Sequence, residues 1–183
     1  MIGDVTVISG PTAVGKGSVV AALRARHPEV WVSVSATTRP PRPGEVDGVH
    51  YHFVDDAEFD RLLATDGLLE WALVHGAARY GTPRAPVEQA VAAGKRAILE
   101  IDLQGARQVK AKLPGVRSVF IAPPRWETLR ERLLQRGTES PAEMERRLAT
   151  AQAELAAADE FDHTVVNDDL GTAVDQLVDL LGL

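Results

Sequence analysis

The stretch Val5–Ser18, which reads VTVISGPTAVGKGS, joins a run of β-branched residues to a lysine through a glycine-rich turn. The run VTVI is typical of a buried strand, and a helical pattern continues over Lys16–Arg26. Between them, Gly10, Gly15 and Lys16 match the pattern G-x-x-x-x-G-K, in which backbone N–H groups turn inward around an anion. The order of strand, glycine-rich turn and helix therefore indicates a phosphate-binding loop.

The chemistry of this loop depends on a few positions. Lys16 can reach the β- and γ-phosphates of a nucleotide, and the helix N-terminus adds the positive end of its dipole. The strict pattern has Ser or Thr directly after the lysine to contact Mg²⁺, but here Gly17 holds that position and Ser18 follows. A contact from Ser18 to Mg²⁺, direct or through water, stays open, and a plain strand-to-helix turn is the alternative. The candidate ATP-binding residues of the loop are Gly10, Pro11, Thr12, Ala13, Val14, Gly15, Lys16, Gly17 and Ser18.

The composition limits the class of protein. The 183 residues, with 45% hydrophobic and 25% charged residues, suit one domain or a core with small inserted subdomains. A stretch of about 18 apolar residues is absent, as is a signal-peptide pattern, so we expect no membrane association. The absence of cysteine fits a cytoplasmic protein. A net charge of −6 argues against a nucleic-acid partner, and the expected assembly is a monomer or a small homo-oligomer.

Strand and helix patterns alternate along most of the chain. This alternation predicts an α/β fold with a doubly wound, mainly parallel sheet. Expected strands cover residues 4–9, 31–35, 51–54, 68–74, 96–102, 118–122 and 163–167. Expected helices cover residues 16–26, 55–65, 86–93, 105–112, 126–135, a helix capped by Ser140, and 170–183. Prolines and glycines make 37–49 irregular and predict a loop at 76–84, so residues 35–86 look like an insertion into the core.

A second anion site is indicated in the insertion. Arg39 and Arg42 are three residues apart among prolines, and such a stiff pair of guanidinium forks suits one phosphate. Tyr51 could give a further hydroxyl donor. Two alternatives are a polyproline II ligand for a partner domain and a solvated basic face.

These residues carry a resemblance. The segment 35–54, SATTRPPRPGEVDGVHYHFV, closely resembles the GMP-binding segment of guanylate kinases. The match extends through LLEWA, YGTP, EIDLQGA, RGTES and VVNDD. The resemblance implies a P-loop NTPase core with inserted NMP-binding and lid subdomains, and Mg²⁺-dependent transfer of a phosphoryl group from ATP to GMP. It implies a core of residues 1–34, 87–124 and 148–183, a GMP-binding subdomain of 35–86 and a lid of 125–147.

The choice of guanine follows from its two in-line donors, N1–H and the N2 amino group. One carboxylate accepts both, whereas adenine would leave it unpaired. By resemblance that carboxylate is Glu70, although its residue chemistry alone fits a surface carboxylate at a strand end. The stretch GAARYGT is one residue longer than in the family, and Arg79 is expected to add a contact of its own. The GMP-binding residues implied by the resemblance are Ser35, Arg39, Arg42, Tyr51, Glu70, Tyr80, Thr82 and Asp102.

Glu100 and Asp102 end a buried strand at the edge where α/β sheets bind ligands. The family has Asp where Glu100 stands, and the candidate Mg²⁺ contacts are Ser18 and Asp102. Asp102 is alternatively a helix cap. By resemblance Asn167 lies near the ATP adenine, and a cap is again the alternative.

The lid is expected to supply arginines. Arg132 and Arg136 lie four residues apart on one predicted helix, and Arg147 follows on the next. These three match the lid arginines of guanylate kinases, and with Lys16 they form the expected catalytic set. The alternative for these arginines is a role as exposed helix residues.

Two rival functions stay open. One is a kinase for AMP, CMP or another monophosphate, and the other is a non-catalytic guanylate kinase-like module that binds phosphopeptides.

Overall fold

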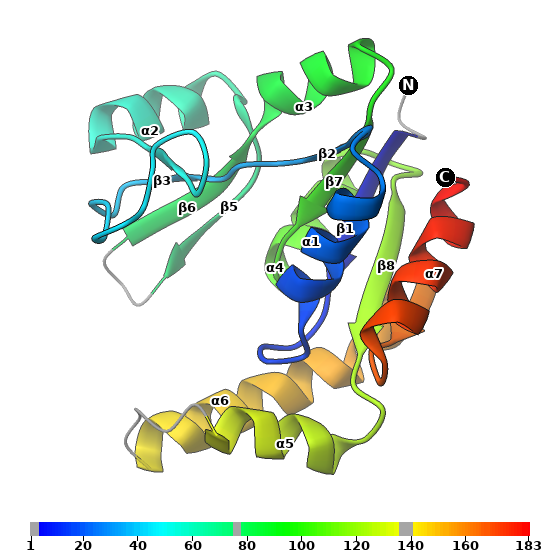
Figure 1. Cartoon of the computed structure of the whole chain (residues 1–183). Coiled ribbons are helices and arrows are strands. Elements are labelled where there is room, and N and C mark those ends of the chain that lie inside the picture. Colours follow the sequence, from blue (N-terminus) through cyan, green and yellow to red (C-terminus); the bar gives the residue numbers. More distant parts are fainter. Residues whose placement is uncertain (1–3, 75–77, 136–140) are drawn as a thin grey trace.

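Five parallel strands form the core sheet of the computed structural model, which describes residues 4–74, 78–135 and 141–183 (Figure 1). Their spatial order is β2 (Val30–Val32), β7 (Arg96–Glu100), β1 (Val5–Ser9), β8 (Arg117–Ala122) and β9 (His163–Val166). The expected α/β fold with a mainly parallel sheet is confirmed.

Alternating residues of these strands face two separate hydrophobic layers, as the two-residue period of a strand requires. On β1, Ile8 packs with α1 (Lys16–Arg26) and α7 (Leu170–Leu181). Val7 instead packs with α3 (Arg84–Ala92) and α4 (Leu103–Lys112). Each of these strand residues is fully buried. The sheet is therefore covered on both faces, which explains why its strands read as almost continuous apolar runs.

The register brings the carboxyl ends of the core strands to one edge. Ile8 on β1 is level with Glu100 on β7, and Ala122 on β8 is level with Val166 on β9. The glycine-rich turn follows β1 directly, so it lies at this edge beside the residues after β7 and β9. This is the edge at which open α/β sheets bind ligands.

A second sheet lies in the insertion. Its order is β4 (His52–Phe53), β3 (Ala36–Thr37), β6 (Ala78–Pro83) and β5 (Leu68–Val74). Helix α2 (Asp56–Ala64), capped by Asp55, covers it with the fully buried Phe59. The centres of the Phe59 ring and of the Trp71 ring on β5 lie 6.4 Å apart.

The expected loop at 76–84 is wrong for its described part, because Ala78–Pro83 is strand β6. It pairs antiparallel with both β5 and β3, and this tertiary pairing outweighs the turn propensities of Gly81 and Pro83. A Cβ atom at Gly81 would come within 2.8 Å of the carbonyl oxygen of Glu70, so the glycine permits the close pairing. The expected strand at 31–35 is also shorter, since β2 ends at Val32 and the chain crosses to the second sheet.

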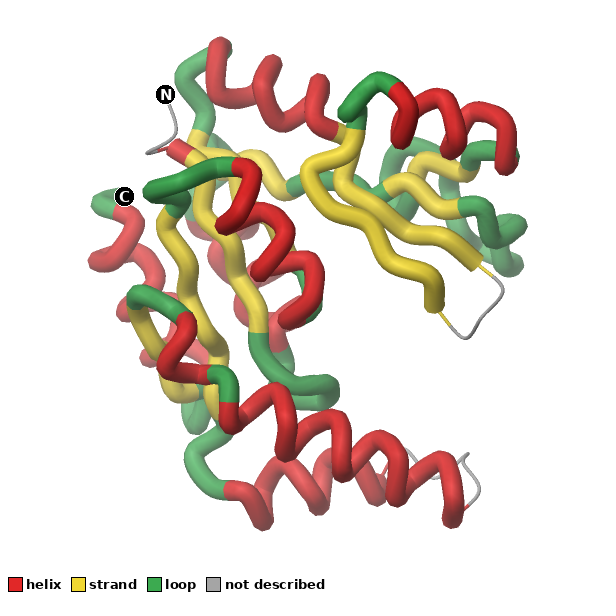
Figure 2. The backbone as a smooth tube through the Cα atoms, turned by 180° about the vertical axis from the view of Figure 1, so that it is seen from behind, coloured by secondary structure: helices red, strands yellow, loops and turns green. Residues whose placement is uncertain are grey.

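Helices α5 (Trp126–Gln135) and α6 (Pro141–Ala156) project from the same side of the core as the second sheet (Figures 1 and 2). Leu129, Leu133 and Ala151 anchor them in the core layer of α1 and α7. The expected boundary between lid and core at 147–148 falls inside α6. A short 3₁₀ helix (Ala158–Glu160) follows. The expected cap Ser140 lies outside the described residues. Within the described residues, every helix is too short or too polar to cross a membrane.

Candidate functional site

Glycine is required at two points of the loop between β1 and α1. Gly10 has φ 147° and Gly15 has φ 94°, both in the region that side chains disfavour. A Cβ atom at Gly10 would collide with the carbonyl oxygen of Ile121, and one at Gly15 would lie 2.6 Å from Nδ2 of Asn167. The loop is thus pressed against the ends of β8 and β9, in the tight turn that the motif predicts.

Lys16 is folded back into the loop. Its Nζ donates to the carbonyl oxygens of Gly10 and, at 3.4 Å, Pro11. Burial lowers the pKa of Lys16 below its ordinary value. The carboxylates that oppose this shift belong, in decreasing order of effect, to Glu154, Glu100 and Asp102. The lysine therefore lies among carboxylates at the carboxyl edge of the sheet.

The carbonyl oxygen of Val14 joins three parts of the chain. This oxygen accepts hydrogen bonds from Nδ2 of Asn167 at 2.8 Å and from Nη1 of Arg132 at 3.3 Å. Asn167 is 7% exposed, and the cap of α7 is Asp169, whose carboxylate accepts the Thr172 N–H. The capping alternative for Asn167 is therefore wrong, and its amide holds the loop instead.

A cavity of about 470 Å³ opens beside this junction. Four of the residues expected to bind ATP line it, and its mixed polar and apolar lining suits a nucleotide. The lining of the cavity includes Ala13, Gly15, Ser18, Arg132, Asn167 and Leu170.

Two acidic residues at the end of β7, Glu100 and Asp102, lie next to the loop. A Cβ atom at Gly17 would be 3.5 Å from Oε1 of Glu100, so this carboxylate faces the position where the strict motif has a hydroxyl. Burial raises the pKa of Glu100, and Lys16 opposes the shift. Asp102 is the N-cap of α4 and accepts the Gly105 N–H at 2.7 Å, so the capping alternative for Asp102 is confirmed. In the described part of the chain, acidic and histidine side chains form no group of three or more able to hold a metal by themselves.

Glu70 is buried on β5, with 6% exposure, so the alternative of a surface carboxylate is wrong. Its Oε1 accepts the hydroxyl of Thr82 at 2.6 Å. Burial raises the pKa of Glu70, the Thr82 hydrogen bond opposes this, and Asp102 adds to it. Glu70, Thr82 and Asp102, three residues expected to contact the base, thus share one neighbourhood.

Arg39 is held from several sides in the irregular segment. Its Nε donates to the Tyr80 hydroxyl at 3.1 Å, and its Nη2 forms an ion pair with Glu45 at 2.8 Å. The guanidinium carbon lies 5.6 Å from the centre of the Tyr51 ring. With its side chain 15% exposed, Arg39 does not belong to a solvated face.

Arg42 is exposed, and its main-chain N–H donates to Glu45 at 2.7 Å. Glu45 therefore accepts hydrogen bonds from both arginines, a role that the sequence did not predict. Ser35 lies half-buried immediately before β3.

Arg79 makes its contacts within the protein, and its expected contact with a ligand stays a prediction. Its guanidinium forms ion pairs with Asp60 and Asp56 on α2, and its carbon lies 4.7 Å from the centre of the Phe59 ring. Through these contacts Arg79 holds α2 against β6. Tyr80 and Thr82, in contrast, face Arg39 and Glu70, which establishes their register.

The lid side of the site includes Glu154, which the sequence reading missed. Its Oε2 accepts the main-chain N–H of Thr12 in the loop at 3.3 Å. Arg147 lies two turns earlier on α6, half-buried, and so on the same side of this helix. The third expected arginine, Arg136, lies outside the described residues.

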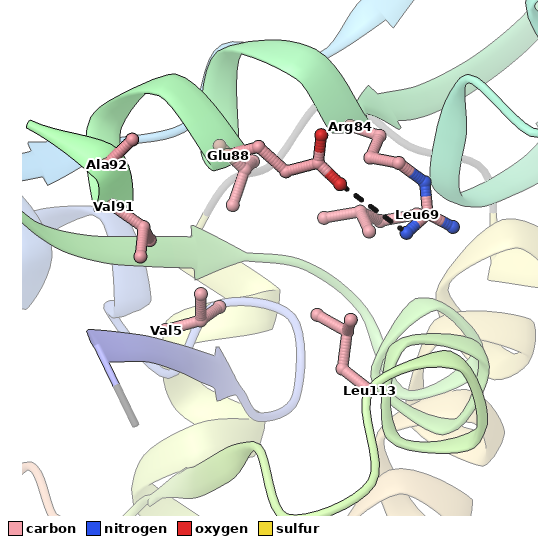
Figure 3. Close-up of a pocket in the computed structure, with 8 residues that line it drawn as sticks. Val5, Leu69, Arg84, Glu88, Val91, Ala92 and Leu113 are labelled. Carbon is pink, nitrogen blue, oxygen red and sulfur yellow. Dashed lines mark ion pairs between the residues drawn. The ribbon is translucent and has the colours of Figure 1, made fainter. Parts of the chain in front are cut away.

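A separate cavity of about 390 Å³ lies between β1, β5, α3 and the end of α4 (Figure 3). Apolar side chains such as Val5, Leu69 and Leu113 line it, and Arg84 and Glu88, 3.9 Å apart, form an ion pair at one side. It contains none of the residues expected to bind a nucleotide, and its apolar lining does not suit a phosphate.

The comparisons with known proteins agree with this geometry. The family model described as guanylate kinase matches residues 3–182. A guanylate kinase of Leifsonia xyli is 61% identical over 175 residues, covering 96% of this chain and 69% of that protein. One of Thermobifida fusca is 61% identical over 176 residues, covering 96% of this chain and 89% of that protein.

Two solved structures are similar. The crystal structure of guanylate kinase from Anaplasma phagocytophilum has a TM-score of 0.74 and 32% identity, covering 97% of this chain and 83% of that one. A shikimate kinase from Bacteroides thetaiotaomicron has a TM-score of 0.51 and 13% identity, covering 98% of both chains, which is a likeness of fold alone.

Proposed function

The chain belongs to the guanylate kinase family, and we propose from this premise how its residues carry out the reaction. The enzyme transfers the terminal phosphoryl group of ATP to GMP and gives ADP and GDP. An oxygen of the GMP phosphate forms a bond to the γ-phosphorus, and the bond from that phosphorus to the β–γ bridging oxygen breaks. Donor and acceptor are both anions, so catalysis consists mainly of positioning and charge neutralisation.

The loop between β1 and α1 holds the ATP phosphates through its main-chain N–H groups. Lys16 exchanges its bonds to the carbonyls of Gly10 and Pro11 for phosphate oxygens. The cavity lined by Ala13 and Leu170 takes the rest of the nucleotide, with Asn167 at its wall. The support for this assignment is the convergence of the loop, Arg132 and Asn167 on the Val14 carbonyl.

Mg²⁺ fits the oxygen donors at this edge. The exposed Ser18 hydroxyl and the Asp102 carboxylate are the residues that would hold it, with Glu100 near Lys16 as a further oxygen donor. When bound with ATP, the ion neutralises part of the phosphate charge. Because the described residues lack an acidic cluster of their own for a metal, the nucleotide phosphates are expected to supply most of the ligands.

The second sheet holds GMP. Arg39, Arg42, Tyr51 and Tyr80 bind its phosphate, and Glu70 accepts N1–H and the N2 amino group of guanine. Ser35, Thr82 and Asp102 complete the base pocket. Glu45 keeps Arg39 and Arg42 in place before the substrate arrives, which reduces the ordering needed on binding.

Arg132, Arg136 and Arg147 neutralise the transferring phosphoryl group when the arm of α5 and α6 approaches the second sheet. We propose the division expected from the sequence, with a core of 1–34, 87–124 and 148–183, a GMP-binding part of 35–86 and a lid of 125–147. Closure excludes water and limits hydrolysis of ATP. ATP and GMP are the partners, and we propose a cytoplasmic monomer or small homo-oligomer without nucleic-acid or membrane partners.

The buried contact between Glu70 and Thr82 carries the assignment of the base pocket, because a carboxylate is rarely buried without a purpose for its second oxygen. The test is Glu70→Gln, assayed with GMP and AMP as acceptors and ATP with Mg²⁺ as donor. We expect the preference for GMP over AMP to fall by about tenfold or more. An unchanged preference would remove Glu70 from the pocket.

A further inference from the structure

Gly105 stands in the first turn of α4, where its backbone conformation does not require glycine. Its φ lies outside the left-handed region, and its N–H donates to the Asp102 cap as in an ordinary helix start. Glycine within a helix is less favourable than alanine, because it loses more conformational freedom on folding. The residue is also buried, so the missing side chain is not replaced by solvent. Its presence therefore calls for a steric reason.

The steric reason is the pair of carboxylates around it. A Cβ atom at Gly105 would lie 2.9 Å from Oε2 of Glu70 and 3.2 Å from its Cδ. The same atom would lie 3.3 Å from Oδ1 of Asp102. All the nearest atoms belong to these two side chains rather than to the backbone of β5. The glycine thus leaves room for a carboxylate where α4 contacts β5.

Each oxygen of the Glu70 carboxylate has a close neighbour. Oε1 is held by the Thr82 hydroxyl, and Oε2 lies against Gly105. A side chain at residue 105 would push Oε2 away, because the end of a glutamate moves more readily than a helix. The expected consequence is a rotated or shifted carboxylate, which no longer lies in line with two donors of a purine.

We propose that Gly105 is a positioning residue for purine selection: by lacking a side chain, it lets Glu70 and Asp102 stand together against the start of α4. This proposal rests on the proposed role of Glu70 in reading the base. Gly105 itself does not need to touch GMP. It acts through the carboxylate that lies against it.

The test is Gly105→Ala, with KM and kcat measured for GMP, AMP and ATP. We expect KM for GMP to rise about tenfold, since the loss of aligned hydrogen bonds to a charged acceptor has about this effect. The preference for GMP over AMP should fall, while KM for ATP stays within about twofold. Because alanine favours the helix, the melting temperature should stay the same or rise.

Gly171→Ala is the matched control. Gly171 also lies in the first turn of a helix with an aspartate cap, and its added Cβ atom would be 3.3 Å from Oδ1 of Asp169. The control tests the general effect of such a substitution, and KM for GMP should be unchanged. Wild-type selectivity and KM for GMP in Gly105→Ala would overturn the proposal.

A double variant separates this proposal from the one on which it depends. With Glu70→Ala, the space beside residue 105 is empty, so Gly105→Ala should add nothing further to KM for GMP. If Gly105→Ala alone lowers the melting temperature, the double variant should restore it, and a melting temperature low in both would overturn the proposal. If Glu70→Ala itself leaves selectivity intact, the role of Glu70 fails first. Loss of selectivity with Glu70→Ala but not with Gly105→Ala overturns only the role of Gly105.

Discussion

The main-chain N–H of Thr12 donates to the carboxylate of Glu154 at 3.3 Å, across 142 residues of sequence. The contact joins the nucleotide loop to the last turns of α6, the helix expected to carry Arg147 in the lid. Glu154 also opposes the lowering of the Lys16 pKa more strongly than any other group. One side chain thus supports both the shape and the charge of the loop.

Glu154→Ala should raise KM for ATP about five- to tenfold, because the Thr12 amide loses its acceptor. Glu154→Gln keeps an oxygen acceptor, so its KM should lie closer to the wild type. Steady-state kinetics with varied ATP check this, with Glu145→Gln on the exposed side of α6 as control. A KM that falls in both variants would mean that the carboxylate competes with the phosphates instead.

Lys16→Ala should lower kcat by at least about 10²–10³-fold, because a cation that neutralises charge on the transferring group is lost. Its fold should survive, since the substitution removes a buried charge whose pKa burial already lowers. Turnover and the melting temperature are the measurements. Lys95→Ala, at an exposed lysine, is the control for loss of a positive charge. Wild-type turnover in Lys16→Ala would refute the role of the loop.

The core was predictable because local patterns and tertiary structure agree there. The helices at Lys16–Arg26 and Trp126–Gln135 have their expected bounds, since their apolar faces repeat at helical spacing. Strand β6 was not predictable in this way, because pairing with two neighbours decides its conformation. The same holds for Glu154 and Gly105, whose significance depends on contacts with distant residues.

Asp162→Asn should lower the free energy of unfolding by about 1–2 kcal/mol at pH 7. The carboxylate accepts both the N–H and the hydroxyl of Ser118 at 2.7 Å, and the hydroxyl bond in particular lowers the pKa of Asp162. A lowered pKa gives stability that is present above the unfolded-state value, near 4, and is lost as the pH falls through the folded-state value. Urea unfolding should show the gap to wild type narrowing in acid.

The Asp162 prediction concerns stability alone, because Ser118 lies near the start of β8, at the edge of the sheet away from the nucleotide loop. KM for both nucleotides should therefore be unchanged. Asp159→Asn, at an exposed position nearby, is the control. Equal unfolding free energies for Asp162→Asn and wild type at pH 7 would contradict the prediction.

Arg39→Lys should raise KM for GMP by about ten- to a hundredfold and leave KM for ATP unchanged. Lysine keeps the charge but cannot reproduce the fork that contacts Tyr80, Glu45 and a phosphate together. Glu45→Gln should give a smaller increase, since it loosens Arg39 without removing it. Arg61→Lys, at an exposed arginine that forms an ion pair with Glu58, is the matched control. An equal effect on both substrates would show a general loss of structure.

GMP binding should weaken as the pH falls, and the loss should begin at a higher pH than it would if Glu70 had the ordinary pKa of a glutamate. Burial raises the pKa of Glu70, and Asp102 adds to that shift. As the pH falls through this raised value, Glu70 gains a proton, one of its oxygens becomes a donor, and it no longer accepts two guanine N–H groups. The folded state gains stability from the same protonation, because the charged form is the one that burial penalises. Weaker binding in acid would therefore not reflect unfolding.

The measurement is the dissociation constant of GMP from pH 8 down to about pH 4.5 for wild type and Glu70→Gln. The phosphate of GMP titrates in both cases, so the ratio of the two constants isolates the carboxylate. We expect this ratio to approach one as the pH falls, because protonated glutamate and glutamine then present similar groups. A ratio that stays constant over the whole range would mean that the charge of Glu70 does not act on the base.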